Sequence, residues 1–295
     1  MRARLLLLFG AAVLMTVTMS SNVAEAASIT VNDTSDRGSA TTCSLRGAII
    51  AANNDGPVDG CPAGSGADTI HVPAGVYTLT LGAELRITTD LSLIGAGPEA
   101  TIIQAATAPG SATHRVLRAD RFTTVAISGV TIRHGDAAGN LGGSGGGITT
   151  NGALSLTNVH VSQNNAPIFG GGIFTESEST LTIVDSTISD NTAGVNAGGI
   201  WARTGLELTN STVANNTATE GGGIYTRGPT TIRGSTVSGN SATTAAGVYV
   251  KDTVTVVNST VSGNTAANSG GGFYTQTGGT LVLTNTTITN NHANS

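Results

Sequence analysis

The chain has 295 residues, of which 11% are charged and 3% are aromatic, and its formal net charge is −5. This excess of acidic groups argues against nucleic acid or an anionic membrane as a partner, because both are bound through clustered cations. Its 41 glycines stand among many Ser, Thr and Asn residues, a composition typical of disorder unless apolar residues recur at regular intervals.

The first 26 residues are organised like a secretory signal peptide. Arg2 and Arg4 precede an apolar run over residues 5–17, and the small-x-small triplet Ala24-Glu25-Ala26 follows. The run is shorter than the roughly 20 residues that cross a bilayer, and no later segment is apolar enough to do so. We therefore expect residues 1–26 to be removed and the mature protein to be secreted or at the cell surface, without a membrane span.

Cys43 and Cys61 are the two cysteines of the chain. In the oxidising environment of an exported protein we expect them to form a disulfide, worth about 3 kcal/mol for a loop of this size. Two unpaired thiols are the alternative.

The stretch "CSLRGAIIAANN" (43–54) predicts a short helix, with Leu45, Ile49 and Ala52 on one apolar face. Together with "GADTIHVPAGVYTLT" (66–80) and "LSLIGAGPEATII" (91–103), it resembles the N-terminal module of the bacterial CSLREA-domain proteins. That resemblance implies an exported protein with right-handed β-helix repeats. The family has Glu where this chain has Gly47, which removes half of a capping box that would begin at Ser44, so we expect the first turn to fray.

A repeat of 24 to 27 residues dominates the rest of the chain. "STVSGN" occurs at 235–240 and again at 259–264, and looser copies place a final Asn at 164, 191, 216 and 291. Each unit contains three short runs of alternating apolar residues separated by turn residues. The units are too short for propeller blades and lack helical spacing. The sequence therefore predicts an all-β fold, a right-handed parallel β-helix solenoid of the pectin-lyase-like class, with about 25 residues per coil.

Stacking the coils predicts three inward columns. The first is Leu156, Ile183, Leu208, Ile232, Val256 and Leu283; the second is Val161, Ile188, Val213, Val237, Val261 and Ile288; the third is Ile148, Ile173, Ile200, Ile224, Val248 and Phe273. We also expect an asparagine ladder at the bend column of Asn158, Asn210, Asn258 and Asn285, interrupted by Asp185 and Gly234.

We expect one continuous domain after the signal peptide, with a cap and first coils at 27–122 and regular repeats at 123–295. The helix would cover the open mouth of the first coil. The sequence has no comparable lid after "TNNHANS", so the last coil is expected either to pair with another chain or to continue into further coils or an anchor that this sequence does not contain.

The motifs "GGGI" (221–224) and "VxxN" (261–264) are similar to the "GGAI" and "FxxN" motifs of the polymorphic outer-membrane proteins. That resemblance implies an adhesin-like surface protein. Neither resembling family supplies catalytic residues to transfer.

The residues that could carry chemistry are scattered. Asp185 and Asp190 fall in separate bends, and the five histidines show no ligand spacing. "RHGD" (133–136) places Arg133, His134 and Asp136 on one early coil, with Arg115, Arg118 and Arg121 upstream; this cluster is either a solvated bend or a catalytic group, and we favour the bend. We expect no catalytic residues, no metal site and no cofactor. A polysaccharide lyase or glycoside hydrolase remains the alternative, and it would need acidic residues to converge over neighbouring coils.

An outward column follows the third core column. Its members, one residue after each core position, are Phe174, Trp201, Tyr225, Tyr249 and Tyr274. One interpretation is a self-stacking ladder sheltered by the loops before each "GGG"; the other is a binding platform for sugar rings or a partner protein. We expect a non-enzymatic scaffold that binds a polysaccharide or a cell-surface protein.

Overall fold

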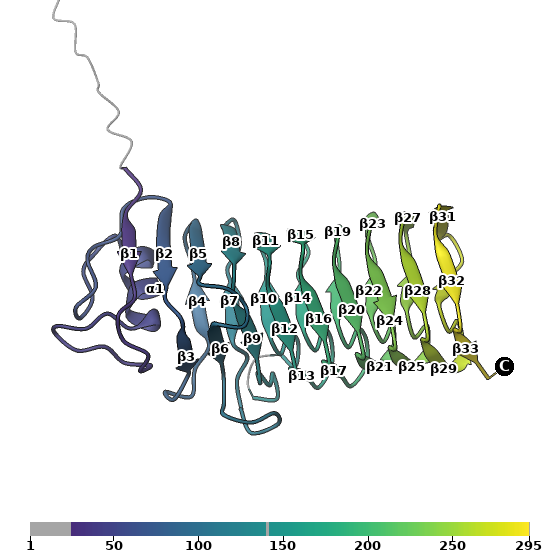
Figure 1. The fold of residues 1–295 in the computed structure, drawn as a ribbon, viewed down its shortest axis with the longest axis horizontal. Helices are drawn as coiled ribbons and strands as arrows, with labels where there is room; N and C mark the ends of the chain where they lie inside the picture. Colours follow the sequence, from purple (N-terminus) through teal and green to yellow (C-terminus); the bar gives the residue numbers. More distant parts are fainter. Residues whose placement is uncertain (1–24, 140–141, 295) are drawn as a thin grey trace, which may run out of the picture.

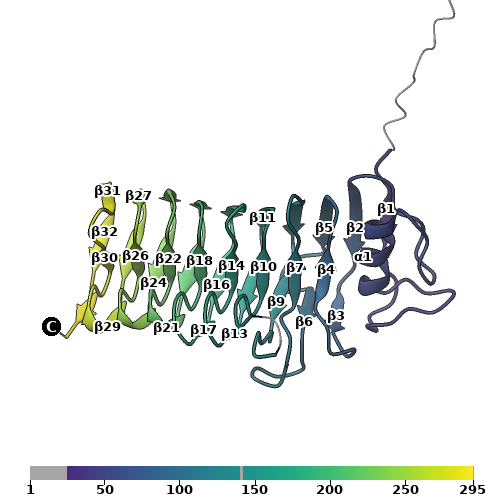
Figure 2. The same ribbon diagram turned by 180° about the vertical axis from the view of Figure 1, so that it is seen from behind.

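The structure is a computed structural model that describes residues 25–139 and 142–294. Apart from Glu25 and Ala26, the predicted signal peptide lies outside these residues. The described chain winds into a long right-handed solenoid of about 9 turns, each of about 26 residues (Figure 1). Seen from behind (Figure 2), the N-terminal coils and the only helix of the described chain occupy one end and the C-terminal strands the other.

The strands form four parallel sheets that run along the solenoid. The largest in the described chain has ten strands. Its strands, in spatial order, are β1 (Ser28–Thr30), β2 (Asp68–Val72), β5 (Leu91–Gly95), β8 (Thr124–Ser128), β11 (Ala153–Thr157), β15 (Thr180–Val184), β19 (Leu206–Thr209), β23 (Thr230–Arg233), β27 (Thr253–Val257) and β31 (Thr280–Thr284).

The next sheet along each coil has nine strands among the described residues. They are β3 (Gly75–Thr78), β6 (Thr101–Gln104), β9 (Thr131–Arg133), β12 (His160–Ser162), β16 (Thr187–Ser189), β20 (Thr212–Ala214), β24 (Thr236–Ser238), β28 (Thr260–Ser262) and β32 (Thr287–Thr289).

A third sheet has eight described strands of three residues each. They are β4 (Leu85–Ile87), β7 (Leu117–Ala119), β10 (Ile148–Thr150), β14 (Ile173–Thr175), β18 (Ile200–Ala202), β22 (Ile224–Thr226), β26 (Val248–Val250) and β30 (Phe273–Thr275).

A fourth sheet, with six described strands, differs from the three strands per coil that the sequence predicts. Its strands are β13 (Asn165–Ala166), β17 (Thr192–Ala193), β21 (Thr217–Glu220), β25 (Ser241–Thr244), β29 (Thr265–Ser269) and β33 (His292–Ala293). Only small alanines, such as Ala193 and Ala218, point inward from it. An alanine gives a weak hydrophobic signal, which is why the pattern of large apolar residues did not predict these strands.

The helix α1 (Leu45–Asn54) confirms the predicted helix, and Leu45, Ile49 and Ala52 are buried. It lies at the N-terminal end of the solenoid (Figure 1). Arg46 donates to the carbonyl of Glu84, and Asn53 donates to that of Arg86 at 2.8 Å. Side chains of the helix thus supply hydrogen bonds to backbone carbonyls at the outer edge of β4. The helix therefore covers the N-terminal edge of the eight-stranded sheet.

The first turn of α1 is capped despite the missing Glu. The Ser44 hydroxyl accepts a hydrogen bond from the Gly47 amide at 3.1 Å. A Cβ at position 47 would lie 3.2 Å from Cys61 Sγ, because the Cys43–Cys61 disulfide packs against this turn. The disulfide confirms the pairing expected from the sequence.

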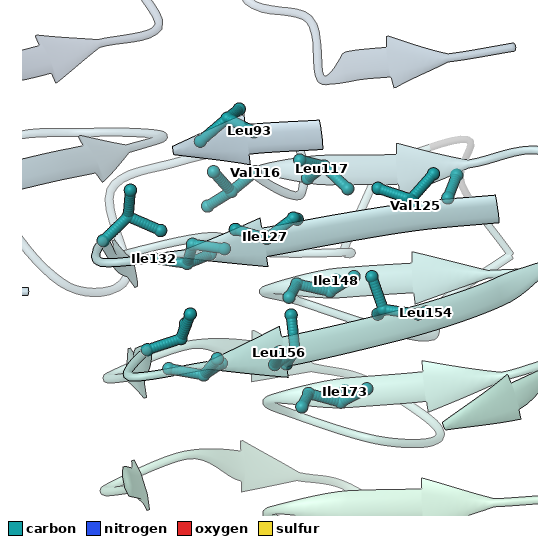
Figure 3. Close-up of a cluster of buried hydrophobic side chains, with 14 of the residues drawn as sticks. Leu93, Val116, Leu117, Val125, Ile127, Ile132, Ile148, Leu154, Leu156 and Ile173 are labelled. Carbon is teal, nitrogen blue, oxygen red and sulfur yellow. The ribbon is translucent and has the colours of Figure 1, made fainter. Parts of the chain in front are cut away.

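The three predicted core columns are confirmed except at their last members, Leu283, Ile288 and Phe273, which lie in the last described coil and are not buried. They fill the interior together with residues of the first coils, and Figure 3 shows Ile127, Ile148, Leu156 and Ile173 converging between the sheets. In the last described coil Leu283 and Ile288 are 43% and 47% exposed. No helix of the described residues is long and apolar enough to cross a membrane.

The predicted asparagine ladder is wrong in its column. Asn158, Asn210, Asn258 and Asn285 are exposed and have φ between 47° and 53°, so they serve as left-handed bends. The hydrogen-bonded ladder is instead the final Asn of each repeat, which is buried at Asn164, Asn191, Asn216, Asn240 and Asn264 and half-buried at Asn291.

An asparagine inside this ladder forms hydrogen bonds with the coils on both sides. Asn216 Oδ1 accepts from the backbone N and from Nδ2 of Asn191, both at 3.0 Å, and Asn216 Nδ2 donates to Asn240 Oδ1. A serine ladder accompanies it, as where the amide of Ser211 donates to Ser235 Oγ at 3.0 Å. The first and last residues of "STVSGN" are therefore buried polar rungs, and its valine is core.

Candidate ligand-binding surface

The outward residues of the eight-stranded sheet form one column in strict register. The pairing runs through Arg86, Arg118, Thr149, Phe174, Trp201, Tyr225, Tyr249 and Tyr274. Two arginines thus lie at the capped end, and five aromatic residues follow. The five are the predicted binding residues, and the structure places all of them on the outer side of the sheet.

The aromatic rings stack on one another. The centroids of Trp201 and Tyr225 are 4.5 Å apart with ring planes 8° apart, and those of Tyr225 and Tyr249 are also 4.5 Å apart. Phe169, from the turn before β14, adds a ring 4.6 Å from Trp201. Because stacked rings cover one another's faces, the interior members of this aromatic column present their edges outward and not a flat platform.

A turn shelters the column on one side. Ala197 and Ala245 adopt left-handed φ values of 60° and 57° and pack, fully buried, into the aromatic cluster. At the corresponding Gly221, with φ 66°, a Cβ would lie 2.9 Å from Tyr225 Cβ. The chain just before each of the strands β18, β22 and β26 therefore folds back over the rings, which leaves Trp201, Tyr225 and Tyr249 3–7% exposed.

Burial affects the two central tyrosines. Desolvation raises the pKa of Tyr225 and of Tyr249 to about 12, and the Glu220 carboxylate adds to the shift in both. Glu220 is the last residue of β21, directly before the sheltering turn, and Asn196 Nδ2 donates to its Oε2 at 2.7 Å. Both phenols are therefore neutral at physiological pH.

The opposite side of the column carries a row of cations, which we call the cationic rim. It consists of Arg203, Arg227 and Lys251, each the second residue after its aromatic neighbour. The amide of Arg227 donates to Ala202 O and that of Lys251 to Thr226 O, so the backbone register of β18, β22 and β26 extends into the rim. Successive rim residues therefore start from backbones about 4.8 Å apart.

The rim faces the aromatic column. Lys251 Nζ lies 5.3 Å from the centroid of the Tyr225 ring and 5.8 Å from that of Tyr249. The positive charge of Arg227 opposes the rise in the Tyr225 pKa. Arg203 and Arg227 are exposed and Lys251 is half-buried. None of the three forms an ion pair with a residue that the structure describes.

Cations at the capped end, by contrast, all form ion pairs with described carboxylates. Arg86 and Arg118 both bind Asp120, and the Arg118 contact is 2.9 Å long. Their hydrogen bonds and charges lower the pKa of Asp120, although partial burial, the largest single cause acting on it, pulls in the opposite direction. Arg121 pairs with Glu178 at 3.2 Å. The free positive charge of this face is thus concentrated in the cationic rim.

The acidic candidates do not converge. Asp185 and Asp190 are exposed bends with φ of 50° and 57° at opposite ends of β16. Asp190 lines a shallow groove of about 420 Å³ with Gln163 and Asn165, and it is the only carboxylate among the residues lining that groove. General acid and base catalysis on a glycosidic bond requires two.

The "RHGD" cluster is held in structural contacts. His134 Nδ1 lies 2.9 Å from Ala106 O and its Nε2 lies 3.1 Å from Gln163 Oε1. Asp136 accepts from the Ala138 amide and from Asn165 Nδ2, and Arg133 donates to Gln104. Among the described residues no group of three His, Cys, Asp or Glu side chains is placed to hold a metal ion.

The family model for the right-handed β-helix region matches residues 110–250 and 149–295, together more than half of the chain. The chain belongs to this family. The A-module of the mannuronan C-5 epimerase AlgE4 of Azotobacter vinelandii is a similar solved structure, with 15% identity and a TM-score of 0.29 over 86% of this chain and 93% of that one. No curated protein matches the sequence.

In this β-helix protein, sequence reasoning identified the aromatic column but missed the cationic rim. The signal was present: Trp201, Tyr225 and Tyr249 are each followed two residues later by Arg or Lys. Its meaning depended on the backbone continuing in register beyond the strands, which the apolar pattern does not reveal.

Proposed function

We propose that this protein is an exported, non-enzymatic β-helix scaffold that binds a glycan carrying carboxylate groups along the cationic rim. The observation that carries the proposal is the presence of three positive charges on successive coils without a described anionic partner. Like charges on neighbouring strands are destabilising, so a structure that keeps them in a row gains from an anionic ligand. A polymer of uronic acids running along the solenoid would offer carboxylates to several rim residues at once.

The aromatic column has a supporting role in this proposal. Its stacked rings hold adjacent coils in register, and Lys251 Nζ lies over the rings of Tyr225 and Tyr249. Phe174 and Tyr274 are half-buried at the two ends of the stack and are the members best placed to contact a sugar ring. We keep Phe174, Trp201, Tyr225, Tyr249 and Tyr274 as proposed binding residues, the buried middle three because they support the rim, and we add the three cations.

Retention on immobilised polyuronate, compared with a neutral polysaccharide, tests this function. We expect saturable retention on the polyuronate that weakens with salt, because the contacts are exposed charges. The double variant Arg227→Ser/Lys251→Ser should lose about tenfold or more in affinity. Arg233→Ser is the matched control, since Arg233 is an exposed cation at the end of β23 in the ten-stranded sheet.

Each alternative gives a different result. Unsaturated or shortened products would show a lyase or hydrolase and overturn the non-enzymatic assignment. Equal retention of the double variant and the wild type would remove the rim from the binding site. Failure to bind any polysaccharide, with specific binding to a cell-surface protein, would replace the glycan by a protein partner.

A further inference from the structure

The first residue after the predicted signal peptide is anchored by a buried carboxylate. The backbone N of Ala27 donates to Asp68 Oδ1 at 2.9 Å and also to Ser65 O at 3.3 Å. In turn, the amide of Thr69 donates to Ala27 O at 2.8 Å. These bonds begin the pairing of β1 with β2, so Ala27 is where the chain enters the solenoid.

Asp68 is only partly satisfied in this arrangement. It is 1% exposed, and its Oδ1 accepts a second hydrogen bond from the Ser65 amide at 2.8 Å. Its Oδ2 is buried and has no hydrogen-bond partner among the described residues. A Cβ at Gly64 would lie 2.5 Å from this oxygen, so the carboxylate is closely enclosed. A buried carboxylate with an empty oxygen is costly unless a cation accompanies it.

The Ala27 nitrogen, for its part, has fewer hydrogens than it has acceptors. A peptide amide has one hydrogen, which is shared here between Ser65 O and Asp68 Oδ1. An α-ammonium group at the same nitrogen would have three hydrogens and a positive charge. The triplet Ala24-Glu25-Ala26 places the expected cleavage immediately before this nitrogen.

We propose that the Ala26–Ala27 bond is the processing site of the precursor and that cleavage creates an ion pair between the new N-terminus and the buried carboxylate of Asp68. A leader peptidase would add one water across the amide: the C–N bond breaks, Ala26 becomes a carboxylate, and the Ala27 nitrogen becomes an ammonium. The ammonium then serves Ser65 O and the Asp68 carboxylate with separate hydrogens. Maturation thereby completes the cap of the solenoid.

The mass of the exported protein gives the first test. Intact mass and N-terminal sequencing should place the mature start at Ala27. A start at any other residue would overturn the proposal, because the ammonium could not then occupy the position of the Ala27 nitrogen.

A double-mutant cycle tests the ion pair. Protein beginning at Ala27 should melt about 5 °C or more above protein that retains Ala26 before it, since the extension replaces the ammonium by an amide. In an Asp68→Asn background the same extension should cost little. Asp59→Asn, at an exposed carboxylate, is the control and should leave the cost of the extension unchanged. If protein with Asp68 intact melts at the same temperature with and without Ala26, the proposal is overturned.

Amine acetylation keeps the proposal falsifiable if Asp68→Asn fails to fold. Lys251 is the only lysine, so in Lys251→Arg the α-amine is the only amine of the mature chain. We expect it to react with an acylating reagent at least about tenfold more slowly in the folded protein than in denaturant, because an ion-paired ammonium is held protonated. Equal rates in the two states would overturn the ion pair.

Discussion

The first coils (27–122) and the regular repeats (123–294) hold their polar groups in different ways. The first coils use contacts that occur once: the disulfide, the pair of Asp36 with Arg46 at 2.7 Å, and the pair of Arg115 with Glu84 at 2.9 Å. The repeats use ladders in which Ser lies on Ser, Asn on Asn and ring on ring.

The difference follows from stacking in register. Each rung of a parallel β-helix places a residue about 4.8 Å from its equivalents in the adjacent coils, so a side chain must be compatible with copies of itself. Asparagine qualifies because its amide both donates and accepts, and aromatic rings stack, whereas like charges repel. Charges therefore gather where the sequence does not repeat. The cationic rim breaks this rule, and this exception is why we assign it to binding.

The largest effect should come from breaking a ladder. Asn216→Ala removes both bonds that Asn216 Oδ1 accepts from Asn191 and leaves buried donors unpaired. We expect the free energy of unfolding to fall by about 3 kcal/mol or more in chemical denaturation. Asn210→Gly is the control, because Asn210 is an exposed bend with φ 50° that glycine also adopts, and it should change little. Equal losses in the two variants would contradict the assignment of the ladder.

A slightly smaller loss in the free energy of unfolding is expected at the cap. Cys43→Ser/Cys61→Ser should lower the free energy of unfolding by about 3 kcal/mol, through the loop that the bond closes. Hydrogen exchange should show the loss of protection concentrated in α1 and β1, with the repeats unaffected. Loss spread evenly over all coils would mean that the cap and the repeats unfold together.

Raising the pH should weaken the repeats through their tyrosines. The pKa of Tyr225 and of Tyr249 is about 12 in the fold, above the usual value of about 10. Their contribution to stability is therefore full below about pH 10 and is lost as the pH rises through 12. Phenolate absorbance should show late titration that Tyr225→Phe and Tyr249→Phe each reduce. Titration of every tyrosine near pH 10 would contradict the burial of the column.

The smallest expected effect is a gain in thermal stability. Arg227→Gln removes the middle charge of the cationic rim and relieves repulsion from Arg203 and Lys251. We expect a slight rise in Tm at low ionic strength that disappears in salt, while binding to polyuronate weakens. Arg233→Gln should show no such rise. A fall in Tm that persists in salt would indicate a structural role for Arg227.

The sequence predicted much of the fold because the repeat places equivalent residues in register. The period, the three core columns, a helix within 43–54 and the disulfide are all visible in it. The asparagine ladder was assigned to the wrong bend, because Asn occupies both bends and only the backbone shows that Asn210 has positive φ while Asn216 is buried. The burial of the aromatic column depends on left-handed turns at Ala197 and Ala245, where alanine gives no turn signal.

The sequence by itself determined that this chain is a parallel β-helix with aromatic residues outside its core, since period and alternation are local properties of the chain. Only the tertiary structure decided which polar residues became buried rungs, that the rings cover one another's faces, and that Arg203, Arg227 and Lys251 form a row. It also decided that the Ala27 nitrogen meets the buried Asp68 carboxylate. These are relations between coils, set by how far each bend turns the backbone.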